Sequence, residues 1–456
     1  MKVKRAFLLL FILVFSWSAS LYAISDEELK KVYTDNNVTL TVEKCIEIGL
    51  VYSKSYYASL MDVQVAEGKY KETKSKLFPS LKLQGTYTRL SKIEPFEMTL
   101  ELPGVPAMHF VISDSILNSY NFQLTVQQPL FTGFALENAT KAARLGSMAA
   151  KEVYKKDRME LIYNIKNAYW GLYQAIEFKK LIDENVALVE SHLNDIQRFF
   201  NQGLAKLNDL MKVQVQLSSM KVNQIEMKHK VRLAAMALNS LLGLPLDKEI
   251  QLASKPEGVP MNTVDLPAIV AKALANRSEI KAMNYNLQAA EAGVKVAKSG
   301  YYPQLALVGN YYMSNPNSRI MPVQKKFQDT WDLSLGLSYD VWNWKATNYQ
   351  VGQANSQLLK AKAGESQLKD MITLEVHQNY FDMVQAKEKI EMSEKNVGQA
   401  EENYRITNER FKAGLTTNSE LLDAEVALLN AKVSRTQSFI DYELARGRFF
   451  KSIGEE

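Results

Sequence analysis

The side chains that could do acid–base or metal chemistry are few and scattered in this sequence. Four histidines stand far apart, without the spacing of metal ligands: His109, His192, His229 and His377. No phosphate-binding loop or nucleophile motif accompanies them. The 50 aspartates and glutamates suit the solvated faces of long helices. These observations predict that the chain is not an enzyme and that it holds no cofactor and no metal.

Two other residue types favour packing over chemistry. Cys45 is the only cysteine, and it falls among Val42, Ile46 and Leu50 on one apolar helix face, so we expect a buried thiol. Methionines recur along one later segment: Met211, Met220, Met227 and Met236. Their sites favour contacts between helices over the binding of an exported metal.

The charge balance bears on one class of partner. The formal net charge is +5, and it falls to +2 without the three basic residues among the first five. A chain that binds nucleic acid would carry a stronger basic excess. We therefore expect no nucleic-acid partner.

The first 23 residues have the pattern of a secretory signal peptide. Lys2, Lys4 and Arg5 form a basic start, Ala6–Trp17 forms an apolar core, and Ala23 ends a plausible cleavage site. Beyond this segment, no run approaches the roughly 20 apolar residues of a membrane helix. We expect an exported chain, which would use strands if it spans a membrane.

Strands are predicted where apolar and polar residues alternate. The stretch Tyr120–Gly133 begins with eight alternating residues, and Trp331–Trp344 alternates in the same way. A period of two predicts strands with one apolar and one polar face, at 120–127 and 331–339. Shorter alternations predict two further strands, at 81–88 and 305–313.

Helical patterns fill the sequence around these strands. A helix capped by Thr41 is expected to extend to about Leu77. A helix of about 65 residues, roughly 100 Å long, is expected after Gly133. Gly203 marks a turn, and a return helix is expected from about residue 208 to Leu242.

The second half of the sequence repeats this plan. Pro79 and Pro303 are 224 positions apart, and beyond the second loop the offset becomes 211. Pairs at the offset of 211 include Tyr169/Tyr380, Gln174/Gln385, Phe200/Phe411, Gly203/Gly414, Leu210/Leu421 and Gly243/Gly454. This register predicts an internal duplication. The predicted organisation is a signal peptide at 1–23, an extended segment at 24–39, and repeats at 40–264 and 265–456.

The lengths of these elements predict a tube. In each repeat, the first helix and the return helix together match the single long helix, so four rods of equal length result. Four strands cannot close a barrel, and lipid does not tolerate an open sheet edge. Two chains supply eight strands, whose barrel is filled by side chains, whereas three supply twelve and leave a lumen. We expect a mainly α fold with a transmembrane β part of four strands per chain, in a barrel that two or three chains close together.

In such a barrel the apolar strand residues face lipid. The polar residues line water: Lys82, Gln84, Thr86, Asn121, Gln123, Thr125, Asp332 and Ser334. Aromatic residues near the strand ends suit interfacial belts: Tyr87, Tyr120, Trp331, Tyr339, Trp342 and Trp344. A long soluble coiled coil would explain the helices equally well, but it would leave the strands unexplained.

A series of short segments resembles a known family. They are LTVEKCIEIGL at the opening, the FPSL and YPQL junctions, QPLFTG, the RFFNQGL and RFKAGL turns, and NSLLGLPLD. In order and spacing they resemble the TolC family of outer-membrane efflux proteins, also called outer-membrane factors, over nearly the whole mature chain. The resemblance implies a homotrimer in the outer membrane, with a twelve-stranded β-barrel built from four strands per chain. A trimeric α-barrel of long helices would continue it into the periplasm.

The resemblance also implies a function and partners. The chain would be a passive exit duct for efflux or type I secretion, in contact with outer-membrane lipid, a periplasmic adaptor protein and an inner-membrane transporter. Because the sequence has no nucleotide site, the transporter would supply the energy. The loops Ser91–Leu117 and Ser314–Asp329 would face outside. The alternative is a soluble periplasmic coiled-coil adaptor or spacer protein.

Finally, the resemblance implies a gate at the periplasmic helix tips. Glu420 and Asp423 match the gate acids, and because they are three residues apart on one helix they face the same way. Phe411 stands where a tyrosine would form a hydrogen bond across the tip, so we expect a constriction there without that bond. The expected contacts between chains are Asn208 and Asp209. The expected adaptor-docking tips are Gly203, Leu204, Gly414 and Leu415.

Overall fold

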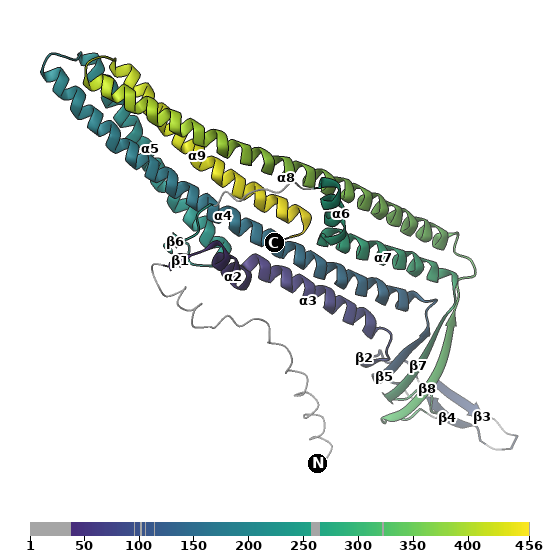
Figure 1. Cartoon of the computed structure of the whole chain (residues 1–456). Coiled ribbons are helices and arrows are strands. Elements are labelled where there is room, and N and C mark those ends of the chain that lie inside the picture. The colour runs from purple at the N-terminus through teal and green to yellow at the C-terminus, as the bar shows by residue number, and fades with distance from the viewer. Residues whose placement is uncertain are drawn as a thin grey trace. The chain divides into compact units, whose positions relative to one another are not determined.

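A computed structural model describes residues 38–94, 96–100, 103–104, 106–113, 115–256, 265–321 and 323–455 (Figure 1). The signal peptide predicted at 1–23 lies outside the described residues, as does the predicted extended segment at 24–39 up to residue 37. The chain forms two compact units. The first unit is built from Met1–Tyr57, Arg158–Val264 and His377–Glu456, and the second from Ala58–Asp157 and Asp265–Val376.

Helices dominate the first unit. They are α2 (Val42–Tyr52), α5 (Leu207–Leu242), α9 (Asn418–Ile453), and parts of α4 (Ala135–Asn201) and α8 (Ala346–Lys412). The two long helices each have 67 residues, close to the length expected from the sequence. Within the described residues, no helix combines the length and the apolar character needed to cross a membrane.

The first helix of each half is interrupted once. Ser53 separates α2 from α3 (Lys54–Ser75), and Arg277 separates α6 (Leu266–Asn276) from α7 (Ser278–Lys298). Both residues have an extended backbone, with ψ of 120° and 130°. The prediction of one continuous helix to Leu77 is therefore wrong. The N–H of Ser53 still bonds to the Gly49 carbonyl oxygen, and that of Arg277 bonds to Ala273. Because only one residue is extended at each break, the helical spacing of apolar residues in the sequence is not disturbed.

Short strands are a second departure from the predictions. The loop predicted at Ser91–Leu117 contains an antiparallel hairpin of β3 (Phe96–Leu100) and β4 (Met108–Ser113). Pro103 and Pro106 fall between these strands, where they do not interrupt pairing. In the first unit, β1 (Val38–Leu40) pairs in parallel with β6 (Ile250–Leu252). Strands of three residues are too short to give a periodic signal.

The core of the first unit gathers around α2, α4 and α5. Tyr169 is fully buried, and its hydroxyl donates to the carbonyl oxygen of Leu40 at 3.1 Å and accepts from the backbone N–H of Ser254 at 2.8 Å. The same core buries Cys45 completely, as predicted. Burial, followed by the charge of Glu43, raises the pKa of the Cys45 thiol to about 12. This cysteine is therefore an inert packing residue.

Gly243 ends α5 in a conformation that should exclude any side chain. Its φ is +72°, and a Cβ there would lie 2.4 Å from the carbonyl oxygen of Tyr52. We expect Gly243→Ala to lower the free energy of unfolding by about 3 kcal/mol, because left-handed backbone costs about 1–2 kcal/mol and overpacking adds roughly 1–3 kcal/mol. Denaturant unfolding in detergent measures this. Gly203→Ala is the matched control, since Gly203 has the same φ and open space around it. Equal losses in both variants would contradict a role for the Tyr52 contact.

Two ion pairs of one buried arginine hold the break at Arg277. The Arg277 side chain is only 8% exposed, and its Nη2 lies 2.7 Å from Oε1 of Glu279. Its Nη1 pairs with Glu375 of α8. Arg277 thus ties the junction of α6 and α7 to α8 within the second unit.

Glu279→Gln should destabilise the fold in a pH-dependent way. Burial raises the pKa of the Glu279 carboxyl, but the hydrogen bond and charge of Arg277 outweigh it and hold the pKa below its ordinary value. Such a carboxylate stabilises the fold above its unfolded-state pKa, and the contribution is lost as the pH falls through the folded-state pKa. The stability gap between the native chain and Glu279→Gln should therefore be full near pH 7 and shrink below about pH 4.5. Urea unfolding across this range measures it, with Glu402 as a matched control for Glu→Gln, because Glu402 is exposed and pairs with Arg405 on its own helix. A gap that stays constant to about pH 3 would contradict the assignment.

The second unit contains a four-stranded antiparallel sheet in the order β2-β5-β7-β8. The strands are β2 (Ser80–Arg89), β5 (Asn118–Phe131), β7 (Gln304–Asn315) and β8 (Gln328–Ser338). They contain the four predicted strands except for Tyr339. β2 and β8 form the two edges of this sheet.

Candidate functional site

The sheet of the second unit has one apolar face and one polar face. Leu83, Leu124, Tyr311 and Trp331 are paired in one row across all four strands. This apolar face is strongly exposed in the single chain, with Leu83 at 74% and Trp331 at 73%. Paired residues project from the same side of a sheet, so the alternation within each strand becomes a continuous apolar surface.

The opposite face carries the residues predicted to line water. Lys82, Thr125, Asn310 and Asp332 form a row across all four strands. The remaining predicted residues share this face by register: Gln84, Thr86, Asn121, Gln123 and Ser334. Sequence alternation therefore separated the two faces correctly.

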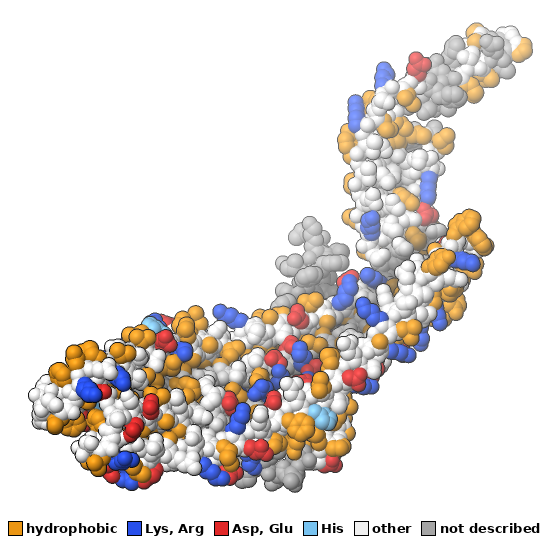
Figure 2. Space-filling model, turned by 90° about the horizontal axis from the view of Figure 1, so that it is seen from above, with side chains coloured by type: hydrophobic (Ala, Val, Ile, Leu, Met, Phe, Trp, Pro, Cys, Tyr) orange, Lys and Arg blue, Asp and Glu red, His pale blue; other side chains and the backbone are white. Residues whose placement is uncertain are grey.

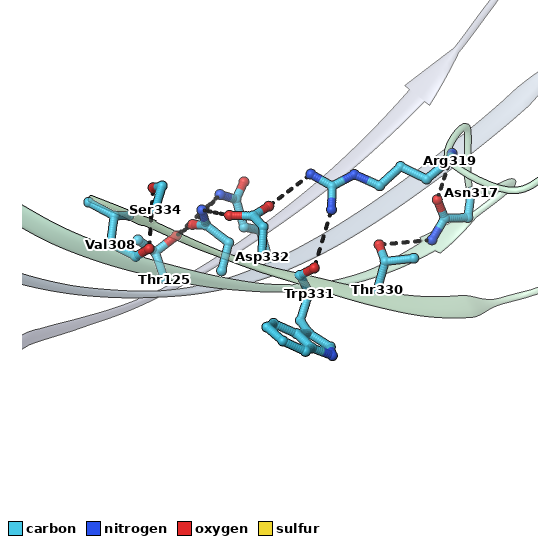
Figure 3. A network of polar contacts seen from close by, with 10 residues as sticks. Thr125, Val308, Asn317, Arg319, Thr330, Trp331, Asp332 and Ser334 are labelled. Atoms are coloured by element: carbon cyan, nitrogen blue, oxygen red, sulfur yellow. Dashed lines mark hydrogen bonds and ion pairs between the residues drawn. The ribbon is translucent and has the colours of Figure 1, made fainter. Parts of the chain in front are cut away.

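A hydrogen-bonded network covers part of the polar face (Figure 3). Thr125 donates from its hydroxyl to Oδ1 of Asn310 at 2.8 Å, and Gln123 donates to the same oxygen at 3.1 Å. Asn310 Nδ2 in turn donates to Asp332 at 2.8 Å. Figure 3 shows the Trp331 ring on the opposite side of the sheet from the Asp332 carboxylate.

The segment between β7 and β8 folds back onto the same face. Arg319 donates to Oδ2 of Asp332 at 2.8 Å, and its guanidinium lies 5.0 Å from the centre of the Tyr312 ring. Asn317 is 3% exposed and donates to the carbonyl oxygen of Gln328 at 3.2 Å. Sequence analysis predicted that this segment is a loop, but it did not predict the contacts of the loop with the polar face.

In the first unit, the candidate site is the pair of turns at one end of the helices (Figure 1). After α4, the N–H of Gly203 bonds to the Phe200 carbonyl oxygen at 2.9 Å, and that of Leu204 to Phe199 at 2.8 Å. After α8, Gly414 and Leu415 make the same two bonds to Phe411 and Arg410, at 2.9 and 2.8 Å. Both glycines have positive φ, which this helix C-cap requires. Leu204 and Leu415 are left 74% and 68% exposed.

The two turns meet around one cavity of about 770 Å³. Its lining includes these predicted site residues: Leu204, Asn208, Asp209, Phe411 and Gly414. A second groove, of about 490 Å³, is lined by Asn208, Lys212, Ser419 and Asp423 among others. The structure thus places Asp423 and Asn208 on the same groove. Gly203, Leu415 and Glu420 are not among the residues lining these two spaces.

Contacts at the turns join α5 to α9. Asn418 is 6% exposed and donates to the carbonyl oxygen of Asp209 at 3.2 Å. Lys212 Nζ donates to the Ser419 hydroxyl at 2.9 Å. Sequence analysis missed Lys212, Asn418 and Ser419. Polar residues are common near the start of a helix, so their presence there does not indicate that they contact another helix.

The two predicted gate acids have different surroundings. Thr417 caps α9 and its hydroxyl accepts from the N–H of Glu420 at 3.3 Å, while the hydroxyl of Thr416 bonds to the Glu420 carboxylate. Glu420 therefore stabilises the helix start. Asp423 is exposed and faces the groove.

The side chain of Phe411 is 6% exposed and packs on His192 and Phe199. In this conformation Phe411 contributes through packing inside the chain. His192 itself is buried against Glu425 of α9. Sequence analysis assigned no special role to His192 or Glu425. Glu425 lies on the same helix face as the apolar Leu421 and Leu428, and a carboxylate on such a face indicates a buried polar partner.

The described residues form no cluster that suits a metal ion, and their surface carries charges of both signs. Within the described residues, no three His, Cys, Asp or Glu side chains are grouped to hold a metal ion. Acidic and basic side chains are interspersed over the helical part of the face drawn in Figure 2.

Known proteins resemble this chain in sequence and fold. The outer membrane efflux protein family model matches residues 53–244 and 269–444. The chain is 23% identical over 348 residues to the alkaline protease secretion protein AprF of Pseudomonas aeruginosa, covering 75% of this chain and 72% of that protein. It is 23% identical over 350 residues to the outer membrane protein TolC of Vibrio cholerae, covering 75% and 77%. The solved structure of the outer membrane protein VceC from Vibrio cholerae shares the fold, with a TM-score of 0.74 at 17% identity over 91% of this chain and 96% of that one.

Proposed function

This chain belongs to the outer membrane efflux protein family, and from this premise we propose that it forms a passive, trimeric exit duct that is gated at its helix tips. The observation that carries the proposal is the sheet with one exposed apolar face, one polar face and two free edges. Such a sheet suits lipid on one side and water on the other, provided that its edges are paired.

The free edges support closure by neighbouring copies. Three antiparallel pairings separate β2 from β8, so the two edge strands run in opposite directions. β8 of one copy can therefore pair antiparallel with β2 of the next. Two copies would give eight strands and a filled interior, whereas three would give twelve strands and a lumen.

Matched helices support the internal duplication. α4 and α8 have 67 residues each, and α5 and α9 have 36 each. The breaks at Ser53 and Arg277 differ by 224 positions, the offset of the first part of each repeat. The family model also matches the chain in two segments.

The duplication extends the contacts seen within one chain to contacts between chains. Lys212 bonds to Ser419 inside the chain. At the offset of 211 between the two repeats, Lys212 corresponds to Asp423 and Ser419 corresponds to Asn208. We therefore place Asp423 opposite Asn208 of the partner subunit, three times around the tip, with Glu420 and Asp209 close by. This arrangement forms the gate, and Phe411 supports it from inside each chain.

The names of the relatives support the proposed partners. One relative is named for alkaline protease secretion and others for efflux pumps. A periplasmic adaptor would dock on the turns at Gly203, Leu204, Gly414 and Leu415, where two exposed leucines offer apolar contact. An inner-membrane transporter would supply the energy.

Conductance and oligomeric state test the proposal together. The protein purified in mild detergent should have the mass of three chains, and in a planar bilayer it should give discrete cation-sensitive channels. A soluble monomer that remains folded without detergent would instead favour a periplasmic spacer. Absence of conductance even with Glu420 and Asp423 both neutralised would refute the duct.

A further inference from the structure

The segment between β7 and β8 holds an arginine over the polar face of the sheet. Nη2 of Arg319 donates to Oδ2 of Asp332 at 2.8 Å, and Nη1 donates to the Trp331 carbonyl oxygen at 3.5 Å. The backbone N–H of Arg319 donates to Oδ1 of Asn317 at 3.0 Å, and its guanidinium lies 5.0 Å from the centre of the Tyr312 ring. Figure 3 shows Arg319 on the side of the sheet where the Asp332 carboxylate lies. These contacts fix the guanidinium over the strands.

A second anchor holds the same segment on the apolar face. The ring of Phe327 packs on the rings of Tyr120 and Phe122, with centroids 5.9 and 6.3 Å apart. Tyr120 and Phe122 alternate in step with Leu124 of the apolar row, so they project from the apolar side of β5. The segment therefore crosses the end of the sheet and contacts both faces. Loss of the Arg319 contacts would leave the Phe327 anchor in place.

The first half of the chain has a neutral residue at the position of Asp332. At the offset of 211, Asp332 corresponds to Asn121, whose Oδ1 accepts from the Ser314 hydroxyl at 2.7 Å. The strands around Asn121 pair without a carboxylate at this position. Formation of the sheet therefore does not require the charge of Asp332, and the contact with Arg319 gives that charge a separate role.

In the proposed trimer, on which this inference rests, the polar face lines the lumen. Three copies of the segment then occupy part of the lumen at its outer mouth, the end where β7 finishes and β8 begins. The side chains of Arg319 and Asp332 are 49% and 30% exposed in the single chain, so water reaches the pair. An ion pair in contact with water is weak by itself, so its loss leaves the paired strands intact.

We propose that Arg319 and Asp332 together determine the width and the ion selectivity of the outer mouth. While the pair is formed, each segment lies in the lumen and the two charges cancel. Loss of either partner frees the segment from the polar face, which widens the lumen. It also leaves three unpaired charges of one sign around the mouth. Carboxylates there favour the passage of cations, and guanidinium groups favour anions.

Planar-bilayer recordings of the full-length protein test this proposal. Every channel, including the reference, carries Asp423→Ala, because a closed tip would otherwise limit the current. The salt concentration is about 0.1 M, where the Debye length of about 10 Å leaves the lumen charges only partly screened. Arg319→Gln and Asp332→Asn should each raise the conductance about twofold, because both free the segment. Their reversal potentials in a salt gradient should shift in opposite directions, toward cations for Arg319→Gln and toward anions for Asp332→Asn.

Lys82→Gln is the matched control for Arg319→Gln. Lys82 lies on the polar face of β2, in the same cross-strand row as Asp332, so this variant removes the same charge from the lumen. It should shift the selectivity toward cations without raising the conductance. An equal rise in Lys82→Gln and Arg319→Gln would show a charge effect alone and overturn the role of the segment.

A charge-swapped variant separates the pair from its two members. Arg319→Glu/Asp332→Arg restores an ion pair with the charges exchanged, so its conductance should return toward that of the reference channel. A swapped channel that conducts like the two single variants contradicts the pairing. Heat-stable trimers on electrophoresis verify folding. Reference-level conductance in both single variants overturns the role of Arg319 and Asp332 alone, whereas absence of conductance in every channel overturns the proposed duct.

Discussion

Leu333→Arg is expected to prevent stable insertion of the protein into the outer membrane. Leu333 is near the middle of β8, on the apolar face, and 64% of it is exposed. An arginine at the midplane of a membrane strand costs about 2–4 kcal/mol. The three copies in the proposed trimer multiply this cost, so roughly 6–12 kcal/mol would oppose assembly in lipid. Membrane fractionation and the yield of heat-stable trimer measure the effect.

Ser334→Arg is the matched control for this prediction. Ser334 is the next residue of the same strand, its side chain lies on the polar face, and its hydroxyl donates to the Val308 carbonyl oxygen at 3.3 Å. An arginine there would face water, so insertion should persist near the native level. Similar losses in both variants would contradict the assignment of lipid-facing and water-facing sides.

Asp423→Ala is expected to raise conductance several-fold and to weaken block by multivalent cations by roughly tenfold, or about 1.4 kcal/mol. Asp423 is exposed in the groove that Asn208 also lines. In the proposed trimer three such carboxylates face one opening, and a ring of like charge concentrates cations. Its removal also deletes the contact with Asn208 of the partner subunit, so the tip should open more often. Planar-bilayer recordings with and without a trivalent cation measure both effects.

Two further acids on α9 separate a gate effect from a general charge effect. Asp441→Ala removes the same charge eighteen residues later, where Asp441 accepts from Gln437 at 2.6 Å. It should leave the cation block unchanged. Glu420→Ala should weaken the block less than Asp423→Ala, because Glu420 is engaged with Thr416 and Thr417. If Asp441→Ala matches Asp423→Ala, the gate assignment fails.

Much of the fold could be predicted because periodic patterns report burial directly. The two-residue period of apolar and polar residues predicted that Lys82, Thr125 and Asp332 share one face of the sheet. This prediction did not require knowledge of how the strands pair. Long helical periods and the glycines at 203 and 414 predicted the long helices and their turns. The interruptions at Ser53 and Arg277 could not be predicted, since one extended residue does not disturb the apolar stripe.

The proposed gate illustrates the same limit at the level of side chains. The motif led to Glu420, Asp423 and Phe411, but it did not distinguish the capped Glu420 or the buried Phe411 from the exposed Asp423. Those differences depend on which helix lies opposite each residue. Periodicity tells which side of a helix is buried, but it does not tell what that side touches.

The residues alone were sufficient for the family, the outer-membrane location and the two-faced strands, because all three depend on local order and spacing. Only the tertiary structure revealed that His192 meets Glu425 across a separation of 233 positions, and that Lys212 and Asn418 tie α5 to α9. Such contacts depend on the packing of helices that are distant in the chain, and that packing is set by many weak interactions acting together rather than by any one segment.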